Sequence, residues 1–410
     1  MARWLRDLNR SINLKLGRMF GGGDKRALQE AADVHRLFLF TSLHAEKLLG
    51  GRLPDGFTEH LIERAQGLSF EEQRAHVHAQ LQQQLADIAA GVHGCLVEAR
   101  DPRPAAAALE QAWQRLHPQQ GGGAGSLGSS PGAPAAKAGQ AGGPLLSQRQ
   151  LSAAVQQRLG YSLDVQPSLI GHQQAGLGLF VEGAALPGAL VALFPGLVYS
   201  KAVYRRMPGY PRIDAGNPYL TARYDGGIVD SLPWGAGWAA DGTTQGSGAR
   251  APVAPARKGL VGRIVAASDG PAAPVPETAW VTPTTGEAAA LELLEGRHPL
   301  ALAHFANHPP PGVAPNVVIA SFKAALPARG AAGAAAQPWA RAYAPNIDYT
   351  QAATLEHLLT TEVSCVGLVA VAPLAAGTEV LLNYRLSPAL RGRPAWYTPA
   401  DPTEENRRWS

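Results

Sequence analysis

The chain has 410 residues, a formal net charge of +4, 46 glycines and 33 prolines, and a hydrophobic content of 46% to which alanine contributes heavily. This composition indicates compact segments separated by unstructured ones rather than one continuous core. The two cysteines, Cys95 and Cys365, are too few for a disulfide framework or a cysteine-rich zinc site, and they favour a reducing compartment. The sequence has no run of 18 apolar residues that would predict a membrane span, and it has no apolar core of the kind found in secretory signals.

Residues 1–20 predict a basic amphipathic helix. Trp4, Leu8, Ile12 and Leu16 recur four residues apart, and most of the net positive charge of the chain lies in this stretch. One interpretation is an organelle-targeting presequence or a membrane-surface anchor. The other is an N-terminal helix docked on its own protein. The expected localisation is intracellular, and these residues decide between an organelle and the nucleus or cytoplasm.

Residues 21–117 predict a small helical domain. An amphipathic segment begins near Leu28, and Ser69 followed by Glu71 and Glu72 indicates an N-cap and an acidic first turn for a helix that runs to about residue 98. A third helix is expected over Ala105–Leu116. Nothing in this region indicates catalytic chemistry. His76 and His78 lie two positions apart, so on a helix they do not form a metal-binding pair.

Residues 118–144 are nearly devoid of large side chains and predict a flexible linker. A formal dinucleotide-binding match at residues 123–128 lacks the strand and helix that such a motif requires. Residues 145–388 predict a mainly β domain with Ala/Gly/Pro-rich loop insertions near 235–278 and 324–340, and residues 389–410 a tail. The sequence pattern predicts a short helix at Leu151–Leu159 and strands at Gly178–Val181, Ala189–Leu193, Gly227–Val229, Val317–Ser321, Cys365–Val371 and Glu379–Leu382. The expected fold class is therefore α+β.

Three short segments carry the functional signal. They are Ala175-Gly176-Leu177-Gly178-Leu179-Phe180, then Phe305-Ala306-Asn307-His308 running on to Pro315-Asn316, then Gly377-Thr378-Glu379-Val380-Leu381-Leu382-Asn383-Tyr384. Further matching text is Phe194–Tyr199, Gly216–Tyr219 with Asp225-Gly226, and Tyr343–Ile347. In this order and spacing, residues 161–388 resemble the SET-domain protein methyltransferases, and within them the group known as SET domain-containing protein 9.

The resemblance implies a β-clip-like SET domain in which the C-terminal segment is threaded past the Asn-His segment. It implies S-adenosylmethionine as cofactor, held by Gly176, Leu177, Gly178, Asn307, His308 and Tyr384. Tyr384 matches the catalytic tyrosine of the family, whose phenol helps to align the acceptor amine with the sulfonium. The implied partner is a protein substrate with an accessible lysine, and the implied site contains no metal.

Three features depart from the family pattern. Residues 309–314 replace a Ser-Cys-containing stretch after the Asn-His pair, and Phe194 occupies the position of a second tyrosine in many members. The zinc-binding cysteines that follow many SET domains are missing, which leaves Trp396 and Tyr397 as candidates to cover the adenine. The Phe194 substitution predicts an altered number of methyl groups transferred, or a lower activity.

Two functional hypotheses remain open at this level. The first is a protein-lysine methyltransferase. The second is a catalytically silent SET module that recognises a partner through its helical N-terminal domain. No nucleophile elbow, Walker loop or Cys-x-x-Cys motif supports hydrolase or redox chemistry, and no basic-aromatic pattern predicts direct nucleic-acid readout. The substrate protein and the oligomeric state are left open.

Overall fold

The computed structural model describes the parts of the chain that carry most of the predicted elements. The described residues are 25–48, 53, 55–99, 146, 148–172, 174–207, 210, 219–231, 298–325, 343–349, 362–386 and 393–409. The expected helices at 1–20 and 105–116, the linker at 118–144 and the insertion at 235–278 lie outside these residues.

Helices dominate the N-terminal part of the described chain and recur as short elements later. They are α2 (Lys25–Leu48), α3 (Phe57–Gly67), α4 (Phe70–Glu98), α6 (Gln148–Leu159), α7 (Lys201–Tyr204), the 3-10 helix η6 (Ala303–Phe305) and α10 (Pro402–Trp409). The long helix α4 begins where the sequence predicts. Ser69 accepts a hydrogen bond from the main-chain N–H of Glu72, whose carboxylate accepts one from the main-chain N–H of Ser69.

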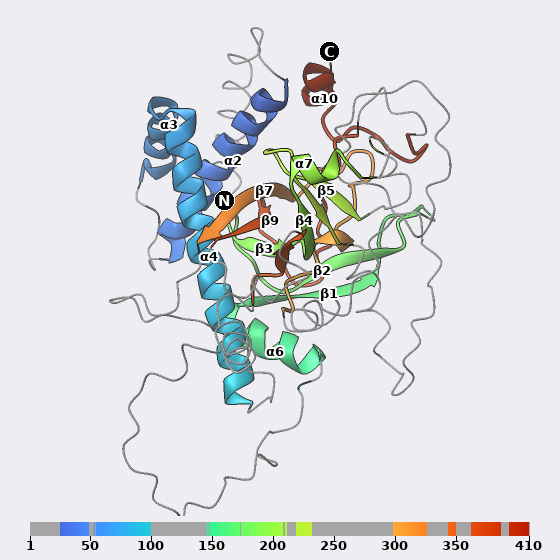
Figure 1. The fold of residues 1–410 in the computed structure, drawn as a ribbon. Helices are drawn as coiled ribbons and strands as arrows, with labels where there is room; N and C mark the ends of the chain where they lie inside the picture. Colours follow the sequence, from blue (N-terminus) through green and yellow to red (C-terminus); the bar gives the residue numbers. More distant parts are fainter. Residues whose placement is uncertain are drawn as a thin grey trace, which may run out of the picture.

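The strands form three small sheets (Figure 1). They are β1 (Tyr161–Pro167), β2 (Leu177–Gly183), β3 (Leu190–Leu193), β4 (Gly196–Tyr199), β5 (Leu220–Ala222), β6 (Ile228–Asp230), β7 (Val317–Ala325), β8 (Asn346–Asp348) and β9 (Glu362–Ala370). The strand orders are β1-β2, β3-β9-β7 and β5-β6-β4-β8. All pairings are antiparallel except β4 with β8, which is parallel.

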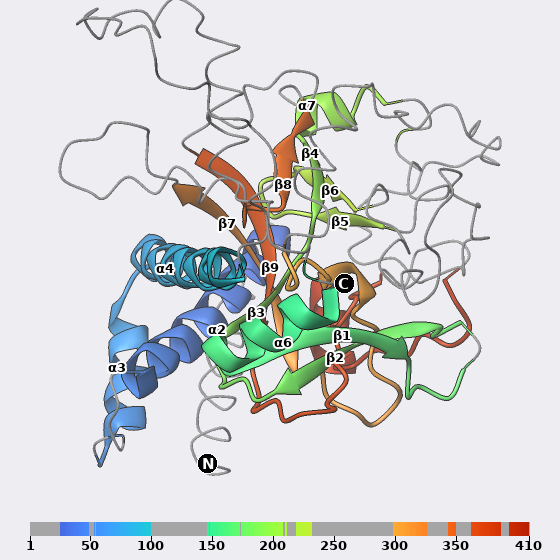
Figure 2. The same cartoon turned by 90° about the horizontal axis from the view of Figure 1, so that it is seen from below.

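Helices pack on two of these sheets. Helix α4 lies against β7 and β3 of the three-stranded sheet, and α6 lies along β1 of the two-stranded sheet (Figure 2). Helix α2 packs beside α4 and also contacts β7 and the C-terminal helix α10. Helices α2 and α10, from the N-terminal and C-terminal parts of the chain, therefore contact each other, and α2 also packs against the sheet that contains β7.

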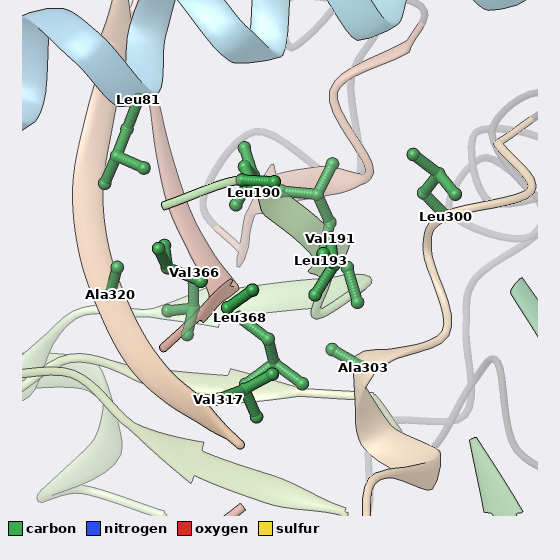
Figure 3. Packing of buried hydrophobic residues seen from close by; sticks show 14 of the residues in the cluster. Leu81, Leu190, Val191, Leu193, Leu300, Ala303, Val317, Ala320, Val366 and Leu368 are labelled. Atoms are coloured by element: carbon green, nitrogen blue, oxygen red, sulfur yellow. The ribbon is translucent and has the colours of Figure 1, made fainter. Parts of the chain in front are cut away.

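One large hydrophobic cluster joins the helices to the sheets. Leu81 of α4 points toward the strands that carry Leu190 and Ala320 (Figure 3), and all three side chains are buried. Val366 and Leu368 of the central strand β9 are fully buried in the same cluster. The apolar run of β9 fits this position, because a central strand covered on both faces needs no polar alternation.

The expected α+β class is confirmed at the level of N-terminal helices followed by several small, mostly antiparallel sheets. None of the sheets in the described ranges closes into a barrel. The predicted strand at Glu379–Leu382 is wrong as a regular strand, since Glu379, Leu381 and Leu382 make only isolated bridges to three separate partners. The expected insertion and tail also contain regular structure: Ala324 and Ala325 belong to β7, and residues 402–409 of the expected tail form α10.

Membrane insertion finds no support in the helices that the structure describes. Within those ranges, every helix is too short or too polar to cross a bilayer.

Candidate functional site

The three sequence segments meet in space. The segment 379–384 runs between β2 on one side and the Asn307 segment on the other. On the first side, the main-chain N–H of Val380 donates to the oxygen of Leu179 at 2.7 Å. On the second, the main-chain N–H of Leu382 donates to the oxygen of Asn307 at 2.8 Å. Segments separated by about 70 to 200 positions along the chain thus share one hydrogen-bonded strip.

The two glycines of the first segment are required for different reasons. Gly176 has a φ of 58°, which lies in the left-handed region that glycine adopts without strain. Gly178 has no space for a β carbon, because that atom would lie 2.3 Å from Oε1 of Glu379. Leu177, between them, begins β2, and its main-chain oxygen accepts a hydrogen bond from Nδ2 of Asn307 at 3.0 Å.

Glu379 of the third segment forms a bridge with Phe180 of the first and a hydrogen bond with Asn307 of the second, and sequence reasoning gave it no role. Its carboxylate accepts hydrogen bonds from Ser168 Oγ at 2.6 Å, from the Leu169 N–H at 2.9 Å and from Asn307 Nδ2 at 3.1 Å. It is 7% exposed. A buried carboxylate needs such donors to compensate for lost hydration. The one available signal was an acidic residue at the start of the apolar run 379–382.

Asn316 fixes the same segment from the opposite edge. Its Nδ2 donates to the main-chain oxygen of Glu379 at 2.8 Å, and its Oδ1 accepts from the Leu381 N–H at 2.8 Å. An asparagine that bonds to both a carbonyl and an N–H of another segment replaces one step of a β ladder. This explains why the predicted strand at 379–382 is held in place without regular pairing.

His308 is held as a neutral imidazole with both nitrogens bonded. The main-chain N–H of Tyr384 donates to Nδ1 at 3.2 Å, so Nδ1 carries no proton. Nε2 lies 2.7 Å from the main-chain oxygen of Thr398, which can only accept, so Nε2 carries the proton. Burial lowers the pKa of His308 to about 4. The ring therefore joins the second segment to the third and to the C-terminal residues, and is uncharged at neutral pH.

Tyr384 points its phenol toward the second segment. Its Oη donates to the main-chain oxygen of Ala306 at 2.9 Å, and its ring centroid lies 5.4 Å from that of His308. The side chain is buried, and burial raises the pKa of the phenol well above its usual value. The hydroxyl thus stays protonated, and its single proton is already directed at Ala306.

The C-terminal residues cover this region with aromatic rings. Tyr397 is 6% exposed and stacks on His308 with ring centroids 4.3 Å apart. Trp396 stacks on His172 at 4.9 Å, and its Nε1 donates to Oε1 of Gln174 at 2.5 Å. Tyr397 therefore lies beside His308 of the second segment, and Trp396 lies beside His172 and Gln174, which precede the first segment.

Two other segments of the resemblance, Phe194–Tyr199 and Tyr343–Ile347, meet in the four-stranded sheet, whereas residues 216–218 of a third lie outside the described residues. Strand β4, which follows Phe194, pairs in parallel with β8, and Gly196 lies opposite Asn346. Nδ2 of Asn346 also donates to the main-chain oxygen of Phe194 at 2.8 Å. The Phe194 side chain is 1% exposed and belongs to the large hydrophobic cluster.

The chemical content of the site follows from these side chains. Within the described residues, no group of three His, Cys, Asp or Glu side chains is arranged to hold a metal ion. A separate hollow between α4 and α6 is lined by Cys95, Glu98 and Arg158 among others, and none of the three segments reaches it. The three segments together supply a buried neutral phenol, a buried neutral imidazole and a buried carboxylate, and Trp396 of the C-terminal residues adds a stacked indole ring.

Comparison of the chain with models of protein families, with curated proteins and with solved structures finds no match in any of the three.

Proposed function

We propose that the chain is a SET-type methyltransferase that transfers a methyl group from S-adenosylmethionine to a protein lysine. The observation that carries the proposal is the meeting of the three segments, with the Tyr384 phenol directed at the residue before Asn307. The resemblance predicts that these segments line one cofactor site, and their shared strip of hydrogen bonds supports that expectation.

The groups at the meeting point fit the proposed cofactor. Because the Tyr384 hydroxyl donates its one proton to the main-chain oxygen of Ala306, its oxygen can act only as an acceptor toward any other group. Lone pairs attract a positively polarised methyl group and the N–H of an amine. The aromatic surface of Trp396 and the backbone at Gly176 would contact the cofactor, and the bonded polar groups of Asn307 and His308 would keep those surfaces in position.

In the proposed reaction, the protein acts by positioning and by its low polarity. When bound, S-adenosylmethionine supplies an already activated methyl group. Tyr384 aligns the attacking amine through its oxygen, and its raised pKa keeps it from acting as a base. A buried surrounding disfavours the ammonium form of a lysine, so the acceptor reaches Tyr384 as the nucleophilic amine.

The test combines cofactor binding with transfer. Calorimetry with S-adenosylmethionine should show binding, and labelled cofactor with a whole-cell protein extract should label a substrate. Tyr384→Phe should abolish the labelling. Tyr161→Phe is the matched control, because Tyr161 is also buried and donates to a main-chain oxygen, that of Leu190, at 2.7 Å. Absence of binding at millimolar cofactor, or equal labelling by both variants, would overturn the proposal.

Phe194 gives a second prediction on product distribution. A tyrosine at this position would add a hydroxyl, and in the proposed reaction it restores one hydrogen bond to the acceptor amine. Phe194→Tyr should therefore change the ratio of mono- to dimethylated product, measured by mass spectrometry. Because the ring is 1% exposed in an apolar cluster, unfolding by urea should also show a loss of about 1–3 kcal/mol. An unchanged product ratio in a folded variant contradicts the assigned role.

A catalytically silent SET module is the second candidate. The observation in its favour is that Asn307, His308 and Tyr384 all hydrogen-bond within the protein. Such a module would recognise its partner through the N-terminal helices. It predicts no cofactor binding and full biological function for Tyr384→Phe, whereas the methyltransferase predicts the opposite for both measurements.

A further inference from the structure

Arg385, the residue after Tyr384, has an unusual backbone. Its φ is 50°, and it is the one residue other than glycine with a positive φ in the described ranges. A long side chain is strained in this left-handed conformation. Such a conformation persists when the surrounding structure holds it in place. Here it redirects the backbone at the residue that directly follows Tyr384.

The guanidinium of Arg385 is held by carboxylates from both ends of the chain. Its Nη1 and Nη2 donate to the two oxygens of Asp33 in α2 at 2.5 and 2.7 Å. Nη2 also donates to Oε1 of Glu404 in α10 at 3.2 Å. Tyr224 completes the ring of contacts, since its hydroxyl accepts from Nη1 at 3.3 Å and donates to Asp33. The two-pronged contact with Asp33 fixes direction as well as distance.

The charged groups around Arg385 are buried, and their charges balance. The side chain of Asp33 is 1% exposed and that of Arg385 is 9% exposed. Arg36 contacts Asp33 at 3.4 Å and Glu404 at 3.5 Å, so two positive and two negative charges balance each other. Burial, the largest single influence, would by itself raise the pKa of the Asp33 carboxyl. The charges of Arg385 and Arg36, together with the hydrogen bonds from Arg385 and Tyr224, outweigh burial and hold that pKa below the usual value. Each buried charge therefore depends on its partners.

We propose that Asp33 is a positioning residue for Tyr384, acting through Arg385: helix α2 anchors the left-handed turn that aims the phenol at Ala306. Helix α10 contributes the second anchor through Glu404. On this proposal the N-terminal helices help to position Tyr384, and they do not act solely as a partner-binding module.

The test observes Tyr384 directly. The full chain is labelled with 3-fluorotyrosine, and the fluorine resonance of Tyr384 is assigned with Tyr384→Phe. Asp33→Asn keeps the shape of the side chain and removes its charge, so it should shift or broaden the Tyr384 resonance. Glu30→Gln is the matched control, because Glu30 lies on the same helix and pairs with Arg74 instead. The control should leave the resonance in place.

Two further measurements keep the outcome decisive. Should Asp33→Asn not fold, Glu404→Gln removes the other anchor, and it should move the same resonance by a smaller amount. An unmoved resonance in a folded Asp33→Asn or Glu404→Gln protein overturns the inference. The kinetic part of this inference rests on the proposed function: Asp33→Asn should lower kcat about tenfold and leave the affinity for the cofactor unchanged. If the wild type binds no cofactor, that kinetic arm fails with the proposed function, and the fluorine resonance still decides the positioning role.

Discussion

Gly178 illustrates how a single hydrogen atom in place of a side chain organises the site. The carboxylate of Glu379 occupies the space that a β carbon would fill, at 2.3 Å from Oε1 and 2.9 Å from Cδ. That carboxylate bonds to Ser168, Leu169 and Asn307. The glycine therefore serves the hydrogen-bond network between the segments, whatever else approaches the backbone there.

Gly178→Ala should destabilise the protein by about 1–3 kcal/mol, because the new methyl group forces Glu379 away from its donors. The measurement is urea unfolding followed by circular dichroism. Gly171→Ala is the matched control in the same region, because a β carbon at Gly171 would meet nothing within 4 Å. The control should stay within about 0.5 kcal/mol of wild type. Equal losses in both variants would contradict the packing argument.

Helix α4 is the element whose start is best defined by local chemistry. Ser69 and Glu72 satisfy main-chain N–H groups that the first turn leaves without helical partners. Along its length, Leu81, Leu85 and Val92 are buried against the rest of the body. The N-terminus of α4 is therefore fixed by local side chains, while one face of the helix is held by packing. The cap should contribute measurably to the free energy of unfolding.

Ser69→Ala should lower the free energy of unfolding by about 1 kcal/mol, because the first turn loses the side-chain acceptor for one N–H. Glu71→Gln changes the same turn without touching the cap, since Glu71 is exposed and pairs with Arg74 at 3.8 Å. It should lose only a few tenths of a kcal/mol. Urea titrations of both variants measure the difference, and a smaller loss for Ser69→Ala than for Glu71→Gln would refute it.

The C-terminal residues 393–409 form the second element that acts at the site. Tyr397 stacks on His308, its hydroxyl accepts from the Leu386 N–H at 3.0 Å, and it donates to Glu405. The guanidinium carbon of Arg393 lies over the Tyr397 ring, 4.4 Å from its centroid. Part of the predicted tail thus packs over His308 and covers one side of the meeting point.

At the scale of the whole molecule, the predictable parts of the fold are those with local signals. The cap at Ser69, the helix at 151–159 and the apolar run of β9 each follow from neighbouring residues. Strands β4, β5 and β8 have three or four residues each, too few for a period to stand out. Helix α10 was missed because its sequence is almost entirely polar.

The site divides in the same way. The three segments could be chosen from sequence because a family resemblance orders them, and the structure brings them together. Glu379 and Asn316 were not given roles, because a hydrogen bond across 63 or more positions leaves no local pattern. The Asp33–Arg385 pair spans 352 positions and joins a helix expected to have no chemistry to the residue after Tyr384. Only the folded arrangement identifies such pairs.

Buried histidines give the molecule as a whole a distinctive response to acid. His44, His298 and His308 are each less than 9% exposed. Burial lowers the pKa of each of them from 6.5 to about 4. They lie in α2, before η6 and in the second segment, so protonation of any one of them disturbs a different part of the core.

The free energy of unfolding should therefore fall as the pH is lowered from about 6.5 toward 4. In this window the unfolded chain binds a proton at each histidine and the folded chain does not, so acid favours unfolding. Each of the three histidines contributes about 1.4 kcal/mol per pH unit to this loss. The carboxyls of Asp33 and Glu404 also have lowered pKa values in the folded protein, and their contributions to stability are lost at lower pH than those of the histidines. Urea unfolding at about pH 7 and about pH 5 measures the slope. His44→Gln should reduce that slope by one proton's worth, and a stability independent of pH across this window would show that the three imidazoles ionise without opening the core.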